Sequence, residues 1–285
     1  MPVADFTHPA SGCLNTIVNF TNASTGATDY EWSFGNGSNS MMEDGHTIYS
    51  ISGLYQVTLT AYNSLGCSHS YSDDIEIISA PQASFNTSIQ SGCTPLSVSF
   101  DNNTNGSNVS YSWSMDGNTY NVEDPAPYQF AATGVNTIHE IILTATNTCG
   151  SNSHSELVEV FPTPHASFST NLSSQCSPVT TVFSNNTTGN PDTYLWDFGD
   201  GETTTDAVPS PRVYITEDSS EDFVIKLFAY NACGSDMAES VVTVLPNTVN
   251  IDLVPSSPIG CSPMFVEFQN NTTGATNFNF DFGDS

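Results

Sequence analysis

The sequence reads Tyr194-Leu195-Trp196-Asp197-Phe198-Gly199-Asp200-Gly201 over residues 194–201 and Phe223-Val224-Ile225-Lys226-Leu227-Phe228-Ala229 over residues 223–229, and these two stretches are the most informative about its architecture. In the second stretch apolar residues recur at every other position, as a half-buried strand requires. The Gly-Asp-Gly cluster in the first stretch is typical of a tight turn. No long segment has helical spacing with caps, so we predict short β-strands joined by turns.

The same pattern recurs about every 83 residues, which indicates a repeat protein. Trp32, Trp113 and Trp196 follow one another at nearly equal spacing, and Phe280 takes the same place one step further along the chain. We expect each Trp to lie in the core of a sandwich of about seven strands. The spacing predicts four domains, with boundaries at residues 1–79, 80–162, 163–246 and 247–285, and the sequence stops partway through the fourth.

The third repeat carries a family resemblance. Tyr194-x-Trp196-Asp197-Phe198-Gly199-Asp200-Gly201, then Tyr214, then Phe223-x-Ile225-x-Leu227-x-Ala229-x-Asn231, resembles the PKD (polycystic kidney disease) repeat. The resemblance covers essentially the whole chain, although the first repeat (Trp32 to Gly37) and the second (Trp113 to Gly117) depart from it at the acidic positions. It implies an Ig-like β-sandwich. Short, proline-containing joins between the repeats favour an extended array. We therefore expect an all-β fold of tandem Ig-like (PKD) domains in an extended array.

The charge balance excludes several functions. The chain of 285 residues has 2 Lys and Arg against 30 Asp and Glu, for a formal net charge of −28. Such a surface cannot neutralise phosphates, so we expect no nucleic-acid partner, and it offers no basic patch for anionic membranes. The sequence also lacks an apolar run long enough to span a bilayer as a helix, so we expect no direct membrane insertion.

The seven cysteines follow the repeat, and none forms a C-x-x-C pair. Each complete repeat has one near its start and one just after the Asn that ends the long strand. We predict three disulfides within the repeats, each worth roughly 4 kcal/mol by loop entropy, with buried free thiols as the alternative. Disulfides would also imply an oxidising, extracellular location. The predicted pairs are Cys13–Cys67, Cys93–Cys149 and Cys176–Cys233.

Acidic residues cluster around the Gly-rich turn of the third repeat. Carboxylate oxygens at close quarters suit Ca²⁺, so calcium is the one cofactor that the sequence suggests. The alternative is that Asp and Gly are simply the residues a tight turn prefers. The candidate calcium ligands are Asp197, Asp200, Glu202 and Asp206.

No catalytic motif such as G-x-S-x-G, a P-loop or a Rossmann fingerprint occurs, so we predict that the segment is not an enzyme. Proteins with PKD repeats include cell-surface proteins, secreted enzymes and large bacterial adhesins, and arrays with this Asn/Ser/Thr-rich composition resemble surface proteins exported by the type IX route. The resemblance therefore implies a structural or adhesive stalk of a large cell-surface or filament-forming protein, such as an adhesin of gliding bacteria. Two alternatives are a carbohydrate-binding or spacer module of a secreted hydrolase and a self-assembling fibre subunit. The expected partners are neighbouring repeats, other copies of the chain or a surface polysaccharide.

Overall fold

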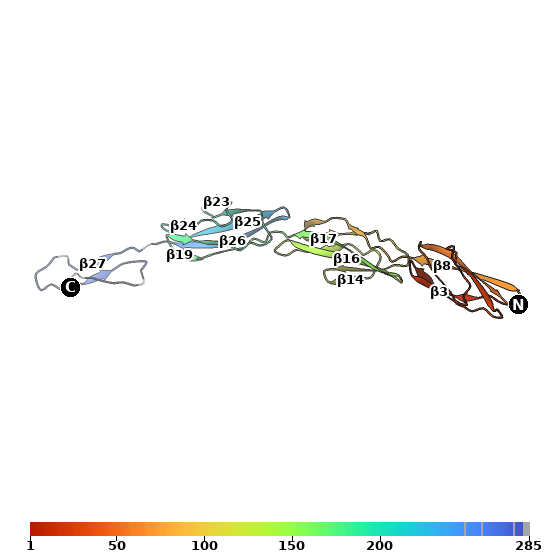
Figure 1. Cartoon of the computed structure of the whole chain (residues 1–285). Coiled ribbons are helices and arrows are strands. Elements are labelled where there is room, and N and C mark those ends of the chain that lie inside the picture. Colours follow the sequence, from red (N-terminus) through yellow and green to blue (C-terminus); the bar gives the residue numbers. More distant parts are fainter. Residues whose placement is uncertain (248, 258, 276, 282–285) are drawn as a thin grey trace. The chain divides into compact units, whose positions relative to one another are not determined.

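The computed structural model describes residues 1–247, 249–257, 259–275 and 277–281 (Figure 1). Within these ranges the regular structure consists of β-strands, and there is no helix. The fold is all-β and Ig-like, as the sequence predicts. The part of the chain described here also contains no helix long and apolar enough to cross a bilayer.

Each of the first three repeats forms a five-stranded main sheet with the same strand order. In each sheet two long strands form an antiparallel hairpin, such as β16 with β17 and β25 with β26. A short strand from the start of the repeat pairs with the second strand of the hairpin. In the first and third repeats this pairing is parallel, and it extends to the last residue of the second hairpin strand. The sheets are β2 (Ser11–Cys13), β8 (Ser68–Ile78), β7 (Gly53–Tyr62), β4 (Asp29–Ser33) and β5 (Asn39–Ser40); β10 (Ser91–Cys93), β17 (Gly150–Phe161), β16 (Thr137–Asn147), β13 (Ser110–Met115) and β14 (Asn118–Tyr120); β19 (Ser174–Cys176), β26 (Gly234–Leu245), β25 (Glu221–Asn231), β22 (Thr193–Asp197) and β23 (Thr203–Thr204).

Shorter strands pair separately from each main sheet. In the first repeat they form one three-stranded sheet, and in the second and third repeats they form two separate pairs. These strands are β1 (Phe6–Thr7), β3 (Ile17–Asn22) and β6 (Gly45–Ile48); β9 (Phe85–Thr87) with β12 (Phe100–Asn102) and β11 (Leu96–Val98) with β15 (Tyr128–Phe130); β18 (Phe168–Thr170) with β21 (Phe183–Asn185) and β20 (Val179–Thr181) with β24 (Arg212–Tyr214).

One Trp lies at the centre of each of these three cores. Trp32, Trp113 and Trp196 are fully buried. Each indole N–H donates to a backbone carbonyl, at 3.0 to 3.1 Å, so the buried polar group is satisfied. Each Trp also meets a Phe ring edge-on, with centroids 5.2, 4.9 and 5.1 Å apart. The repeated Trp is therefore a core residue and does not face solvent.

The described chain divides into two compact units. One comprises Met1–Ala131 and Thr137–Val160, and the other comprises Ala132–Asn136 and Phe161–Ser285. The second unit also includes the beginning of the fourth repeat, in which β27 (Leu253–Pro255) pairs with β28 (Phe268–Asn270).

Candidate functional site

The two cysteines of one repeat lie at opposite ends of its main sheet. In the first repeat, Cys13 pairs in register with Ile78, the last residue of β8, whereas Cys67 immediately precedes the first residue of that strand. The 11 residues of β8 extend over about 36 Å at 3.3 Å per residue. A disulfide requires Cα atoms roughly 4.4–6.8 Å apart, so a bond within the repeat is excluded by the strand between the cysteines.

The structure instead joins successive repeats. Cys13 is bonded to Cys149, with Cα atoms 5.4 Å apart and a sequence separation of 136 residues. Cys93 and Cys233 are also disulfide-bonded. Cys67, Cys176 and Cys261 are free and exposed.

The predicted pairing within repeats is therefore wrong for Cys13–Cys67, Cys93–Cys149 and Cys176–Cys233. The physical reason is the length of the last strand, which separates the early cysteine from the hairpin cysteine. The early cysteine faces the end of its repeat that leads into the next one. The hairpin cysteine lies at the end where its own repeat begins.

The observed bond closes a longer loop than the predicted ones. The loop-entropy model gives about 5 kcal/mol for a separation of 136 residues. Because the loop contains most of the first repeat and much of the second, the bond restricts the unfolded chain of both repeats. It is therefore a covalent connection between domains, in addition to the peptide link.

A single Asn positions the hairpin cysteine. The side-chain oxygen of Asn147 accepts a hydrogen bond from the N–H of Cys149 at 2.9 Å. The side-chain amide of the same Asn donates to the carbonyls of Ser79, at 2.8 Å, and Ser107, at 3.1 Å. Asn147 thus fixes the cysteine and ties the hairpin to the segment where the first repeat ends.

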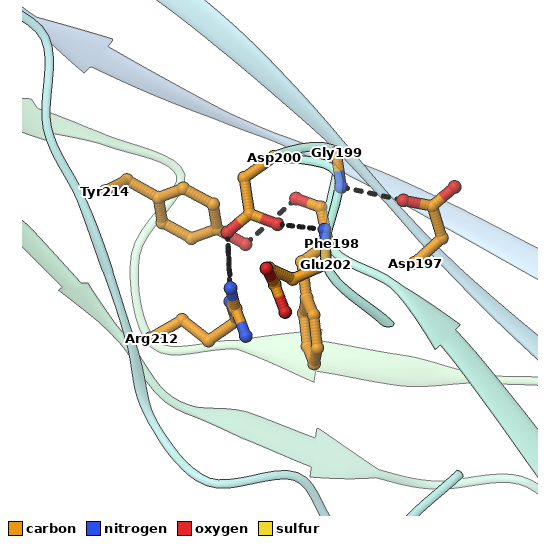
Figure 2. A network of polar contacts seen from close by, with 7 residues as sticks. All are labelled: Asp197, Phe198, Gly199, Asp200, Glu202, Arg212 and Tyr214. Atoms are coloured by element: carbon orange, nitrogen blue, oxygen red, sulfur yellow. Dashed lines mark hydrogen bonds and ion pairs between the residues drawn. The ribbon is translucent and has the colours of Figure 1, made fainter. Parts of the chain in front are cut away.

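A second network of polar contacts surrounds the Gly-rich turn of the third repeat (Figure 2). The Nε and Nη2 of Arg212 both donate to Oδ2 of Asp200, at 3.0 and 2.7 Å. The guanidinium also lies 4.4 Å from the centroid of the Phe198 ring, which is a cation–π contact. The hydroxyl of Tyr214 donates to the carbonyl of Phe198 at 3.0 Å. The network clamps the turn onto β24.

The glycine of this turn is required by close packing. Gly199 has φ of +75°, and a Cβ there would lie 2.7 Å from the carbonyl oxygen of Val224 in β25. The equivalent Gly35 has the same φ and would meet the carbonyl of Gln56 at 2.7 Å. Only glycine combines this backbone conformation with such a close approach to a strand.

Three of the four acidic residues predicted to hold calcium accept hydrogen bonds at the turn. Asp197 accepts a hydrogen bond from the N–H of Gly199, and Asp200 accepts one from the N–H of Glu202, both at 3.0 Å. Asp206 accepts a hydrogen bond from the hydroxyl of Thr204 at 3.0 Å. Nowhere in the described ranges do three or more Asp, Glu, His or Cys side chains gather in an arrangement that could hold a metal ion. The carboxylates of Asp197, Asp200 and Asp206 support the turn, and calcium binding stays a prediction.

The first repeat makes the same clamp without charge. Asn36 takes the place of Asp200, and its side-chain amide donates to the hydroxyl of Thr47 at 3.2 Å. The hydroxyl of Tyr49 donates to the carbonyl of Phe34 at 3.0 Å. Burial raises the pKa of Tyr49, and that of Tyr214, to about 12. These hydroxyls therefore remain protonated donors at neutral pH.

The second repeat replaces the clamp with a histidine. His139, whose side chain is 10% exposed, contacts Asp116 through Nδ1 at 2.7 Å and the carbonyl of Ala131 through Nε2 at 3.1 Å. Its ring packs against Phe130, with centroids 4.9 Å apart. No local sequence signal pairs His139 with Asp116, because they are 23 residues apart on different elements. All three versions stabilise the turn, so we find no chemistry shared by the three turns other than structural support.

Two family models match parts of this chain. Residues 1–79 match the family model of the PKD domain, and residues 162–244 match that of the PKD-like domain. The chain is similar to an I-band fragment from titin, with 13% identity over 87% of this chain and 99% of that chain and a TM-score of 0.49. It is also similar to the PKD1 domain of Vibrio anguillarum Epp, with 29% identity over 27% of this chain and 92% of that chain and a TM-score of 0.24. A search of curated proteins found no match.

Proposed function

Because the chain is a tandem of PKD/Ig-like domains, we propose that it is a non-catalytic structural or adhesive segment of a large extracellular protein. The observation that carries the proposal is the bond between Cys13 and Cys149, which joins two successive domains. A covalent link of this kind serves a chain that must keep its domains together under load. Disulfides also favour an oxidising compartment outside the cytosol.

The charge of the chain supports the same role. A formal net charge of −28 with two cationic side chains makes chains repel one another and remain soluble. One of the two cations, Arg212, is already paired with Asp200. The most concrete form of the proposal is a cell-surface adhesin of gliding bacteria, exported by the type IX route, in which the repeats hold a binding tip away from the cell.

Carbohydrate binding is the main competing role. Sugar sites in proteins commonly use exposed aromatic rings, but the repeated Trp is buried in all three cores. A surface hollow of about 700 Å³ in the first unit is lined by residues 52–54, 76–80, 82 and 105–107, and none of these lining residues is aromatic. The repeated Trp and this hollow therefore offer no exposed aromatic ring for a sugar, which favours the structural role.

Two measurements on the oxidised full chain test the proposal. A glycan array should give no saturable binding, and sedimentation over a wide concentration range should show one monomeric species. Saturable binding of one polysaccharide class would replace the structural role with that of a binding module, and concentration-dependent polymers would replace it with that of a fibre subunit.

Localisation is tested separately on the producing cells. Intact cells should bind an antibody raised against the chain, and the signal should disappear after treatment with proteinase K. Trypsin is unsuitable as the shaving protease, because Arg212 and Lys226 are its only target residues in this sequence. An antigen detected only after cell lysis would contradict the extracellular assignment.

A further inference from the structure

Cys176 occupies the same structural position as the bonded Cys13. Cys13 pairs in parallel register with Ile78, the last residue of β8, and Cys176 pairs in the same way with Leu245, the last residue of β26. In both repeats the residue after the cysteine donates its backbone N–H to the carbonyl of that last strand residue. The N–H of Leu14 donates to Ile78 at 2.9 Å, and the N–H of Ser177 donates to Leu245 at 2.8 Å. The backbone around Cys176 is therefore already in the conformation that carries a disulfide in the first repeat.

The partner of Cys13 has a recognisable local structure. It is the third residue of Asn147-Thr148-Cys149-Gly150, at the tip of the hairpin between β16 and β17. The Asn accepts a hydrogen bond from the cysteine N–H, and the Gly has φ of +144°, which favours glycine. The motif Asn-x-Cys-Gly is thus the part of a repeat that reaches the early cysteine of the preceding one.

The same motif recurs in the third repeat as Asn231-Ala232-Cys233-Gly234. The distance from the N–H of Cys233 to the side-chain oxygen of Asn231 is 2.8 Å, and Gly234 again has φ of +144°. Both hairpins of this type in the chain have their cysteine in a disulfide. Neither is available to Cys176, which is free and exposed.

Cys67 does not present this motif. It follows Asn63-Ser64-Leu65-Gly66, so the glycine precedes the cysteine. The side-chain oxygen of Asn63 also accepts a hydrogen bond from the N–H of Cys67 at 3.0 Å, but here the carbonyl of Cys67 in turn accepts one from the N–H of Asn63 at 3.0 Å. Cys67 thus lies opposite Asn63 where the hairpin strands pair, and not at the tip. A second copy of this sequence therefore offers Cys176 no unbonded hairpin of the required kind.

We propose that the exposed end of the third repeat around Cys176 is a docking site for the Asn-x-Cys-Gly hairpin of a further PKD-like repeat, and that Cys176 forms a disulfide with the hairpin cysteine. The two thiols each lose a proton and together lose two electrons to a disulfide oxidant such as oxidised glutathione, which is released as two thiols. This inference names a specific partner for the chain. Only the biological purpose of the bond rests on the proposed structural role.

The test extends the full chain by one hairpin. Phe280 aligns with Trp196, so a copy of residues 202–245 placed after Ser285 continues the fourth repeat and supplies a third Asn-x-Cys-Gly motif. After refolding with reduced and oxidised glutathione, thiol labelling and peptide mapping should find Cys176 bonded to the added cysteine. The free thiols should fall from three in the present chain, which are Cys67, Cys176 and Cys261, to two.

The matched control carries serine in place of the added cysteine and should keep Cys176 available for labelling. A bond between the added cysteine and Cys261, or an added cysteine that stays free while Cys176 is labelled, would overturn the proposal.

A second measurement uses the chain without any added segment. A peptide copying residues 221–245 with an activated disulfide at its cysteine should couple to Cys176 faster than to Cys67 on the unmodified oxidised chain. Equal coupling rates at Cys176 and Cys67 would also overturn the proposal. Both readouts report the bond itself, so their failure would leave the results on glycans and localisation intact.

Discussion

Reduction of the disulfides should lengthen the chain under mechanical load by a defined amount. When the chain is pulled from its two ends, the bond between Cys13 and Cys149 withholds a segment of 136 residues from extension even after both repeats unfold. Extended residues span about 3.3–3.6 Å each, so reduction should add at least about 450–490 Å to the final contour length. Single-molecule force spectroscopy with and without dithiothreitol measures this difference.

The variant Cys67→Ser gives this experiment its control. Cys67 is free, so the oxidised variant should have the same contour length as the oxidised parent. A bond from Cys67 to Cys13, the pairing that we expected from the sequence, would keep the segment between them from extending in the parent chain. The contour length of the oxidised variant would then exceed that of the oxidised parent by about 180–190 Å. An oxidised parent chain that extends as far as the reduced one would contradict this interpretation.

Four further predictions concern contacts described above. Cys149→Ser should expose Cys13, and not Cys93, to a maleimide, and peptide mapping of the labelled thiol decides between them. Hydrogen bonds from the backbone N–H groups of Ala166 and Met237 lower the pKa of Asp236. The ionised Asp236 therefore stabilises the folded state at pH values above the ordinary pKa of a carboxyl group, and this contribution is lost as the pH falls through the lowered pKa. Asp236→Asn should therefore flatten the acid dependence of hydrogen exchange in β25, whereas an unchanged profile would exclude this carboxylate as the cause. Since burial raises the pKa of Tyr214 to about 12, its contribution to stability is complete below pH 10 and should be lost between about pH 10 and 12. Tyr214→Phe should cost about 1 kcal/mol at neutral pH and remove that alkaline loss, as measured by urea unfolding. Arg212→Thr and Asp200→Asn should each destabilise the third repeat by about 1 kcal/mol, but the double variant recreates the Thr47–Asn36 pair of the first repeat and should lose less than the sum. Strict additivity in the same unfolding assay would mean that the ion pair contributes nothing.

The sequence predicted the strands and the core well, because both depend on local periodicity. Alternation from Phe223 to Ala229 predicts the strand that becomes part of β25, and the repeated spacing of Trp32, Trp113 and Trp196 predicts residues that are fully buried. These features need only the neighbouring residues and the two-residue period of a strand.

The disulfide pairing could not be obtained in the same way. It depends on which end of β8 the short strand β2 reaches, and that is a register between segments far apart in the sequence. The stretch from Cys67 to Ile78, taken as one extended strand, is too long for a disulfide to cross, but this excludes the predicted bond only once Cys13 is known to lie beside Ile78.

The acidic turn was ambiguous for a related reason. The composition around Asp200 fits either a calcium loop or a tight turn, and the choice depends on Arg212, which is 12 residues away and reaches the turn from β24. The composition alone indicates only that most of the 30 acids have no cationic side chain to pair with, because the chain has two. It does not indicate which acid Arg212 contacts.

The bond between Cys13 and Cys149 can form only at a late point in the synthesis of the two repeats. During synthesis the first repeat can complete its strands while Cys13 is still a thiol, since its partner follows 136 residues later. Oxidation of this site must therefore come after the next hairpin has emerged, and in the folded first repeat Cys13 cannot pair with Cys67 in the meantime. The connection between two domains is consequently made in the order in which the domains appear.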